Sequence, residues 1–520
     1  MKHRPQPRQQ SLYDDYVVRR LVPEDHPLLQ IDQAVDFSFV RALVADLYSP
    51  DTGRQAVDPE LLLRLCFLQQ YYALSDREVM ARAQTDLALR AFLHLDLEEA
   101  LPHPSLLSVF RTRLGAERFE EIFNRSVAVA VERGLVQGRL LIVDSYGIVA
   151  DIAVPRLRRL LMRLVERGLK ALAQWGAETG ELAAERKGLA EDTSWWQSKE
   201  LRERDVGAWF GLAQRVQAAV AGAEVGAGQE RVRSQVGGLL AKALQRQAQP
   251  QGSGRRDLLV SDVDGDARWT QRERKKKVFV GYKEQVATDA AHEIITAAAV
   301  TPANVDDQVM LAALLERHGA NTEQKPQAVA GDSGYSSGSN RERLEEEEIT
   351  DFVAVPTPKG HKQGQFSASD FAPEFDEEGT PVRVQCPAGQ VAEGGKWDEP
   401  EQGWTFYLRQ GQCAGCELRE RCTKAKRGRT VFISRHWRRQ EEARRRQAEE
   451  PEFAAAQIAR LGIERTFAYQ QERSALERAW YRGLARVRGQ VFLCCFMVNV
   501  TRIVRAVQGR AGPGRKRKRR

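Results

Sequence analysis

The sequence predicts an α/β protein built around a mixed β-sheet, with helical segments before the sheet and within it. One observation is the order of patterns after residue 136, which reads strand, helical block, two strands, helix, strand, helix and strand. A second is that residues 156–256 carry helical patterns and divide the first strand from the others. Because strands that alternate with helices form sheets covered by those helices, we expect residues 136–155 and 257–356 to form one core.

Length and composition indicate a soluble protein of several domains. A chain of 520 residues is too long for one compact core, and its 42% hydrophobic and 29% charged residues are a usual soluble composition. We expect no membrane span, because we find no apolar run of about 18 residues. The basic start lacks the apolar stretch of a secretory signal. Seven cysteines in so long a chain favour reduced thiols in the cytoplasm over a disulfide framework.

Positive charge is concentrated in two short runs. The formal net charge is +8, and the runs are RERKKK from Arg272 and the basic tail, residues 511–520. Such runs attract polyanions, of which nucleic acid is the commonest, or they only keep a protein soluble. For the tail alone, the two interpretations carry equal weight.

Residues 1–135 are predicted to form a helical domain. Asp58 precedes a proline at a first helical position, and Ser75 with Glu78 forms a capping-box pattern. Arg111 and Arg113 fall on the polar face of a later helical segment, which suits a DNA-binding domain. The pattern alone favours a plain helical bundle.

Two acidic residues interrupt or follow apolar strands. Asp144 lies inside RLLIVDSYGIV, and Asp332 follows the short run AVAG. Buried acids are usually paired, metal-bound or functional, and α/β sheets place catalytic groups at the ends of buried strands. An acid beside glycine is also an ordinary turn residue, so the spacing alone leaves both roles open for Asp332.

Between these two acids the pattern predicts a β-hairpin and a helix. The runs KVFVGYKEQVATD and EIITAAAVTPAN read as two strands joined at Ala290 and Ala291. The helix that follows is expected to end at Gly319, because glycine favours the left-handed conformation after a helix.

Residues 357–435 form a β-rich insertion that carries four of the seven cysteines. Cys413 and Cys416 form a C-x2-C pair, Cys422 follows after five residues, and Cys386 is a distant fourth. Four thiolates can close a tetrahedral zinc site. Four reduced structural thiols are an interpretation of equal weight.

Residues 436–510 are predicted to return to helix. Glu464 lies four residues after Arg460, so the two share one helix face. A glutamate in this position usually belongs to a surface ion pair.

Together, these motifs resemble those of the DDE transposases of bacterial insertion sequences. The resemblance covers most of the chain, and its most specific parts are TPANVDD, GDSGYSS, and Arg460 with Glu464 before YRGL. It implies that the mixed sheet is an RNase H-like catalytic core. It also implies that Asp144, Asp332 and Glu464 are the catalytic, metal-binding acids.

The resemblance also implies the chemistry and the partners. Three carboxylates can hold two Mg²⁺ (or Mn²⁺) ions about 3.5–4 Å apart, which would cut DNA at the ends of the element and join the 3′-OH ends to target DNA. The partner would be double-stranded DNA, both terminal repeats and target, bound by a homodimer at the nucleoid in the bacterial cytoplasm. Basic residues expected to contact DNA are Lys283, Arg460, Arg465, Arg482, Arg111 and Arg113.

Two other functions are open at this point. A magnesium-dependent nuclease would cut without joining, and a regulatory protein descended from a transposase would bind DNA without strand transfer. The presence of all three acids argues against decay at the metal ligands. The tyrosine and lysine that the family places around the glutamate are replaced by Gln457 and Gln471, so DNA contacts at those positions are open.

Overall fold

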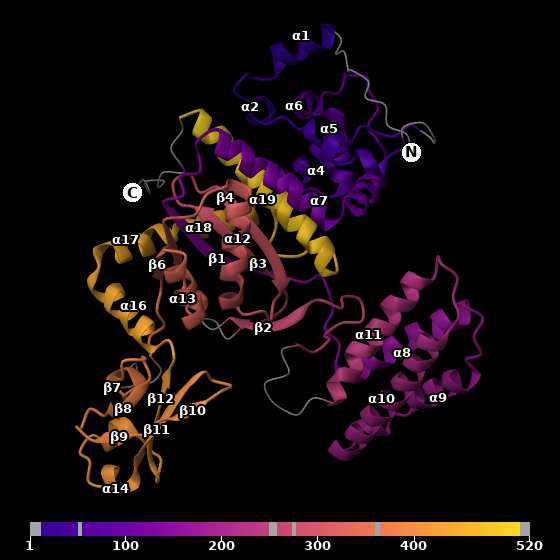
Figure 1. Cartoon of the computed structure of the whole chain (residues 1–520). Coiled ribbons are helices and arrows are strands. Elements are labelled where there is room, and N and C mark those ends of the chain that lie inside the picture. Colours follow the sequence, from indigo (N-terminus) through magenta and orange to yellow (C-terminus); the bar gives the residue numbers. More distant parts are fainter. Residues whose placement is uncertain (1–11, 50–54, 249–256, 273–276, 359–363, 510–520) are drawn as a thin grey trace, which may run out of the picture.

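The computed structural model describes residues 12–49, 55–248, 257–272, 277–358 and 364–509. Residues 273–276 of the first basic run and the whole tail, 511–520, lie outside this part of the chain. Figure 1 shows a central sheet with long helices over it, and two further bodies that extend away from it.

A six-stranded mixed sheet forms the centre of the molecule. Its strands are β1 (Leu140–Val149), β2 (Arg268–Arg272), β3 (Lys277–Asp289), β4 (Ile295–Pro302), β5 (Ala328–Gly331) and β6 (Thr350–Val353). β2 and β4 both pair with β3, and the sheet continues from β3 through β1 and β5 to β6. β3 is antiparallel to β1, β2 and β4, whereas β1, β5 and β6 are parallel to one another. The predicted hairpin is confirmed as β3 and β4.

Alternate side chains of β1 enter hydrophobic cores on opposite faces of the sheet. Leu141 and Val143 pack in a core with α12 (Leu311–Thr322). Ile142 and Ile148 belong to a larger core with the N-terminal helices and α19 (Leu484–Val507). A strand buried on both faces must alternate in this way. Asp144 has the same parity as Ile142, so it belongs to the face of the larger core.

Helices α12 and α19 differ from the expectations drawn from the sequence. α12 runs to Thr322 rather than ending at Gly319, and Glu323 takes the left-handed conformation (φ 56°) after it. α19 is long and apolar enough on average to cross a bilayer, although it contains no uninterrupted apolar run of the length considered in the sequence. Because 83% of its apolar window is buried inside the protein, mainly against α7 (Ser105–Glu132), the sheet and the N-terminal helices, packing accounts for its composition.

The helices before the sheet are α1 (Leu12–Leu21), α2 (Pro27–Ala34), α3 (Phe39–Leu43), α4 (Pro59–Tyr72), α5 (Asp76–Thr85), α6 (Leu87–Phe92) and α7. Helices α2 to α7 contribute side chains to the larger core, whereas α1 packs against α6. The expected caps are present, since Asp58 accepts a backbone N–H of α4 and Ser75 with Glu78 forms both bonds of a capping box. Phe67 of α4 meets Phe496 of α19 with 6.0 Å between ring centroids.

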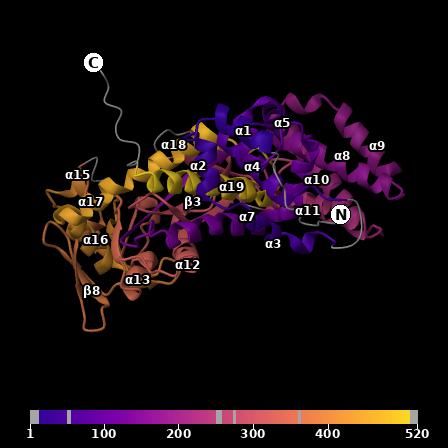
Figure 2. The same cartoon turned by 90° about the horizontal axis from the view of Figure 1, so that it is seen from above.

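Two bodies lie on opposite sides of the sheet in both ribbon views (Figures 1 and 2). The first is the helical insertion, with α8 (Leu157–Gln174), α9 (Gly180–Glu191), α10 (Lys199–Gly222) and α11 (Glu230–Ala248). It has a hydrophobic core of its own, in which Trp209 is fully buried.

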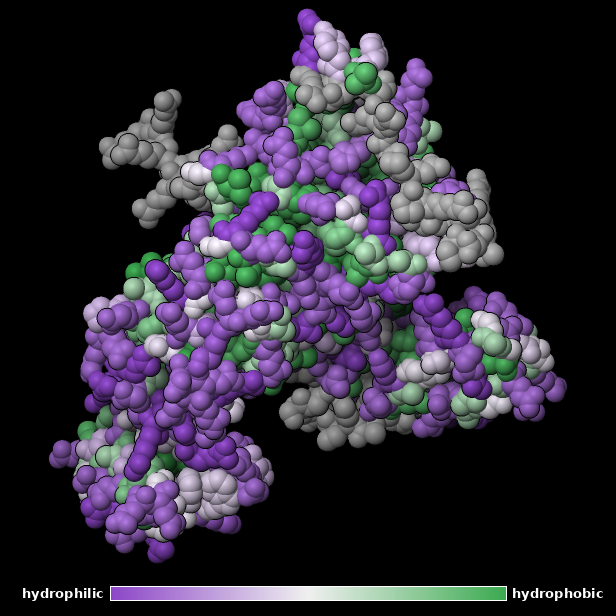
Figure 3. All heavy atoms as spheres, turned by 45° about the horizontal axis from the view of Figure 1, so that its top comes forward, coloured by the Kyte–Doolittle hydropathy of each residue, from purple (hydrophilic) through white to green (hydrophobic). Residues whose placement is uncertain are grey.

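The second body is the cysteine module, defined here as residues 364–435. One of its sheets holds β7 (Ala372–Phe375), β8 (Pro381–Gln385) and β9 (Val391–Glu393). The other holds β10 (Lys396–Asp398), β11 (Gly403–Arg409) and β12 (Gly428–Ser434), with the short helices α14 (Gln410–Cys413) and α15 (Arg419–Cys422) between β11 and β12. Its surface, at the lower left of Figure 3, is mostly hydrophilic.

The chain then returns to the central sheet through three helices. These are α16 (Trp437–Glu449), α17 (Pro451–Arg460) and α18 (Gly462–Ser474). α17 packs against β1, β5 and β6, and α18 packs against β1 and α19. The helix that carries Glu464 is thereby placed beside the strand that carries Asp144.

Candidate active site

Asp144 and Asp332 lie on neighbouring parallel strands. In the pairing of β1 with β5, Val143 is opposite Gly331. The residues that follow these two are Asp144 and Asp332, so the two acids are neighbours. β5 ends at Gly331, which leaves Asp332 at the rim of the sheet. The register therefore brings together two acids that are separated by almost two hundred positions in the sequence.

Glycines on both sides of Asp332 permit this close arrangement. A Cβ atom on Gly331 would lie 2.9 Å from Cγ2 of Val143, and one on Gly334 would lie 2.9 Å from Oδ1 of Asp332 itself. The same Oδ1 accepts the backbone N–H of Gly334 at 2.8 Å and so caps a short 3-10 turn. The glycines in GDSG thus make room for the carboxylate and fix its orientation.

Burial and the nearby charge of Asp332 disfavour the ionised form of Asp144. Its pKa is raised to about 7, first because burial penalises the charged form and then because the carboxylate of Asp332 is close. A smaller contribution in the same direction comes from Asp307. The N–H of Ser145, which Asp144 accepts at 2.8 Å, and the guanidinium of Arg460 act in the opposite direction. The site is a partly buried concentration of negative charge.

Asp307 is a member of this site that the sequence reasoning did not assign. It precedes α12, and its Oδ1 accepts from Nζ of Lys283 at 2.9 Å and from Nε2 of Gln285 at 2.7 Å. Gln285 in turn accepts the hydroxyl proton of the buried Tyr335 at 2.6 Å. The sequence did hold one indication that Asp307 belongs to the site, because Asp307 is the last residue of TPANVDD, one of the motifs on which the resemblance rests.

Arg460 faces Asp144 rather than Glu464. Its Nη1 lies 3.1 Å from Oδ2 of Asp144, and its Nε donates to Oε1 of Gln457 at 3.2 Å. Gln457 also donates to the backbone carbonyl of Gly331, immediately before Asp332, at 3.2 Å. The surface ion pair expected between Arg460 and Glu464 is not among the ion pairs of the described residues, because α17 ends at Arg460 and the guanidinium turns toward the sheet.

Glu464 lies in the first turn of α18 and is exposed. Four residues before it, Arg460 reaches Asp144, and three residues after it, Phe467 stacks on Tyr146 of β1 at 5.4 Å between ring centroids. The helix face around Glu464 therefore rests on the Asp144 strand. Within the described parts of the chain, however, no three histidine, cysteine, aspartate or glutamate side chains are close enough to hold a metal ion.

The remaining basic residues expected at DNA have partners inside the protein. Arg465 and Arg482 keep about half of their side chains exposed, whereas Arg111 is 13% exposed and stacks on Tyr481. Their partners, together with those of Lys283 and Arg113, are as follows: Arg465 with Glu293, Arg482 with Asp151, Arg111 with Asp76, Lys283 with Asp307, and Arg113 with Tyr48.

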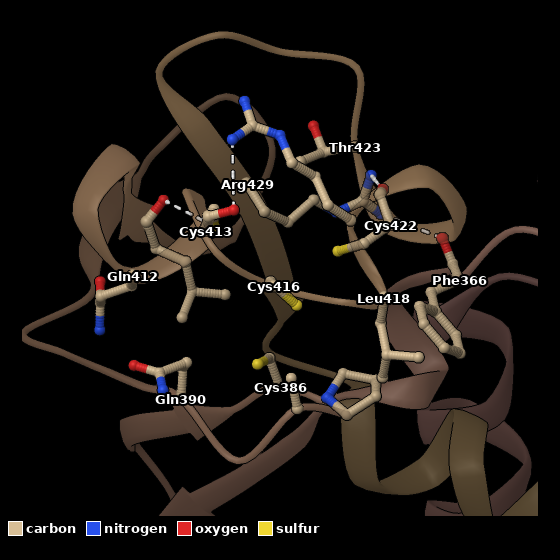
Figure 4. Close-up of a pocket in the computed structure, with 14 residues that line it drawn as sticks. Phe366, Cys386, Gln390, Gln412, Cys413, Cys416, Leu418, Cys422, Thr423 and Arg429 are labelled. Atoms are coloured by element: carbon tan, nitrogen blue, oxygen red, sulfur yellow. Dashed lines mark hydrogen bonds between the residues drawn. The ribbon is translucent and has the colours of Figure 1, made fainter.

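The four cysteines of the module line one small pocket, although they come from two separate segments, the turn between β8 and β9 and the connection between β11 and β12. Figure 4 shows the sulfur atoms of Cys386, Cys416 and Cys422 around its centre. All four are free thiols and are partly buried. The pKa of the Cys422 thiol is raised, first by burial, while Arg429 lowers it and the other three cysteines raise it. The sequence spacing thus identified a set of cysteines that the fold gathers.

Two family models match the two ends of the chain. Residues 16–113 match a model described as a transposase domain (DUF772), and residues 385–504 match one described as a transposase DDE domain. The second covers Glu464 and the four cysteines, while Asp144 and Asp332 lie outside both matches. No curated protein and no solved structure was found to match the chain.

Both matches describe transposases, so the class of protein is that of the transposases. The two matches together are consistent with a transposase of the DDE type, the family that the resemblance in the sequence indicated. The function that these domains indicate is DNA transposition.

Proposed function

We propose that the protein cuts DNA at the ends of an insertion sequence and joins the resulting 3′-OH ends to target DNA. The observation that carries the proposal is the position of Asp144 and Asp332, side by side on neighbouring parallel strands. Their separation in the sequence gives no local reason for two acids to meet in a place where the charge of Asp332 disfavours the ionised form of Asp144. Such unfavourable pairs of carboxylates cluster at functional sites.

The strand order supports an RNase H-like core. The path from β4 through β3, β1 and β5 to β6 has only β3 reversed, and the first acid lies on its central strand. The second acid follows the adjacent parallel strand, and the helix with the proposed third acid packs against the central one. We accordingly assign residues 136–155 and 257–356 as the catalytic core.

The residues at the site fit divalent cations. Asp144 and Asp332 provide hard oxygen donors, and their mutual repulsion is the kind that a bound cation relieves. Glu464 is the third proposed ligand, and its exposure leaves it free to turn toward them. When bound, Mg²⁺ or Mn²⁺ would activate the attacking water or 3′-OH and stabilise the leaving oxygen.

The surrounding side chains would position the DNA and the acids. Gln457 holds the carbonyl before Asp332, and Lys283 with Gln285 holds Asp307. Arg460 carries a positive charge beside Asp144, where a backbone phosphate at the site would need one. Arg465 and Arg482 extend the basic surface, and each phosphate contact would make binding sensitive to salt.

The test is cleavage of DNA taken from the flanks of the protein's own gene. In the presence of Mg²⁺, the wild-type protein should give nicked and joined products, and chelation of the metal should abolish them. Asp332→Asn keeps the size but removes the ligand charge, so it should abolish cleavage while DNA binding survives. A matched control is Asp192→Asn, an exposed residue of the helical insertion, which should cleave like the wild type.

The same assay separates the alternatives. Nicked DNA without joined products would identify a nuclease, and binding without cleavage by the wild type would identify a regulatory protein. Full cleavage by Asp332→Asn would overturn the site assignment. We further propose a homodimer on DNA at the nucleoid, because two element ends must be processed together, and analytical ultracentrifugation with and without DNA would measure it.

A further inference from the structure

The cysteine module has little hydrophobic core for its size. Its buried apolar side chains form one cluster with Trp437, the first residue of α16: Phe371, Val384, Ala392, Phe406, Leu408, Val431 and Ile433. Small folded units with so few buried side chains usually need a covalent or metal cross-link. Cys386, Cys413 and Cys422 adjoin this cluster, so a cross-link there would reinforce it.

The four cysteines are placed where one ion would join both halves of the module. Cys386 lies in the turn between β8 and β9 of the first sheet. Cys413 ends α14, Cys416 lies in the turn after it, and Cys422 ends α15, all in the segment between β11 and β12 of the second sheet. All four line the same pocket, and Figure 4 shows the sulfur atoms of Cys386, Cys416 and Cys422 around its centre.

The backbone around the pocket forms two tight turns, each of which begins at a cysteine. The carbonyl of Cys386 accepts the N–H of Gly389 at 2.8 Å, and Gly389 has a left-handed φ of 79°. The carbonyl of Cys413 accepts the N–H of Cys416 at 3.5 Å, so the C-x2-C pair also closes a turn. Each turn directs a cysteine from the chain toward the shared pocket.

Positive charge is also placed around the pocket. Arg429 Nη1 donates to the carbonyl of Cys422 at 3.0 Å, and Arg419 Nη1 donates to that of Cys413 at 3.2 Å. The Nε atom of Arg429 is buried without a hydrogen-bond partner. Nearby guanidinium groups favour thiolates over thiols. Four thiolates around a divalent cation carry a net charge of −2, which these two arginines would balance, and a thiolate sulfur would accept the unused N–H.

We propose that Cys386, Cys413, Cys416 and Cys422 bind one zinc ion, which fastens the β8–β9 turn to the segment between β11 and β12. Binding converts four thiols into four zinc-bound thiolates and releases four protons, with no change of oxidation state. The described residues hold no set of three ligands already at metal distance, so the thiols move inward on binding, to bonds of about 2.3 Å. The site lies in the cysteine module, away from Asp144, and is independent of the proposed catalytic acids.

The ion would also stabilise the start of the segment that runs from β12 through α16 and α17 to the active site. β12 leads into α16, where Arg439 pairs with Glu342 and Glu345 of α13 (Gly338–Glu346), and α17 then brings Arg460 to Asp144. A zinc ion at the cysteines would therefore restrict the motion of β12, from which α16 and α17 continue. Loss of the ion is therefore expected to loosen the module first.

The experiment is metal analysis of the full chain, purified under reducing conditions without a metal-affinity step. Mass spectrometry of the metal content should give about one zinc per chain. Cys416→Ser and Cys386→Ser should each lower the zinc content severalfold. Cys66→Ala is the matched control, because Cys66 is buried in α4 outside the module, and it should keep the full content.

A second measurement on the wild type keeps the proposal testable where a variant fails to fold. After removal of zinc, Co²⁺ should produce the absorption of a tetrahedral thiolate site, and four thiols should become protected from a thiol reagent when zinc is restored. A folded wild-type protein that takes up neither metal, with the four cysteines equally reactive before and after zinc addition, would overturn the proposal.

Discussion

Glu284 of β3 is buried in a way that should make the stability of the protein depend on pH. The side chain is fully buried, and its Oε1 accepts from Nε2 of Gln470 at 2.8 Å and from the thiol of Cys495 at 3.3 Å. Its Oε2 is buried without a partner. Burial raises the pKa of Glu284 to about 7 from its ordinary 4.5, although the bonds from Gln470 and Cys495 lower it. The cluster joins β3, α18 and α19, and so supports the helix that carries Glu464.

The direction and the size of this dependence of stability on pH follow from the pKa of Glu284 in the unfolded and the folded protein. The unfolded chain releases the proton near pH 4.5, whereas the folded protein keeps it until about pH 7. The folded state therefore holds more protons in this window, and its stability falls as the pH rises through it. Above pH 7 the loss is constant, and the difference between 4.5 and about 7 corresponds to about 3 kcal/mol.

Glu284→Gln removes the charge and keeps an acceptor for Gln470. We expect the variant to be more stable than the wild type by up to about 3 kcal/mol at pH 8, with the advantage lost at pH 4.5. Hydrogen exchange of peptides from β3 and α19, measured for both proteins at each pH, reports the opening free energy of this core. Glu472→Gln, an exposed change on α18, should show no such trend. An advantage of Glu284→Gln that stays constant from pH 4.5 to pH 8 would refute the reasoning.

Two further predictions concern the active site. Arg460→Ala leaves the carboxylate of Asp144 without its cation, and we expect cleavage to fall on the order of a hundredfold, with partial recovery in Arg460→Lys, as measured by the rate of nicking. Gly331→Ala places a methyl group 2.9 Å from Val143, so we expect a loss of about 1–3 kcal/mol in stability by thermal unfolding and a slower nicking rate as Asp332 is displaced; unchanged stability and rate would contradict the packing argument.

Local patterns in the sequence predicted much of the secondary structure. The caps at Asp58 and Ser75, and the hairpin of β3 and β4, depend on neighbouring residues, so their signals are present in short windows. The end of α12 was misplaced because Glu323 accepts a left-handed conformation that glycine would take more easily. α19 reaches the mean hydropathy of a membrane span without an uninterrupted apolar run, because isolated charged and polar residues divide its apolar stretch.

The pairing of distant side chains could not be predicted in the same way. Arg460 seemed by its spacing to belong with Glu464, but its partner is Asp144, 316 positions away. Arg111 looked like a cation on a polar helix face, yet it is held between Asp76 and Tyr481. Periodicity gives the face on which a residue lies, whereas the packing of other elements decides what that face meets.

The sequence by itself singled out the candidate site residues: Asp144 in an apolar strand, Asp332 between glycines, Glu464 after Arg460, and four cysteines in one module. These signals are local, or rest on motifs that resemble those of DDE transposases. Only the tertiary structure decided that β1 and β5 are neighbours, that Asp307 joins the two aspartates, and that Glu464 remains exposed. The physical reason is that strand register and helix docking are fixed by the burial of side chains from the whole chain, which no short stretch of sequence contains.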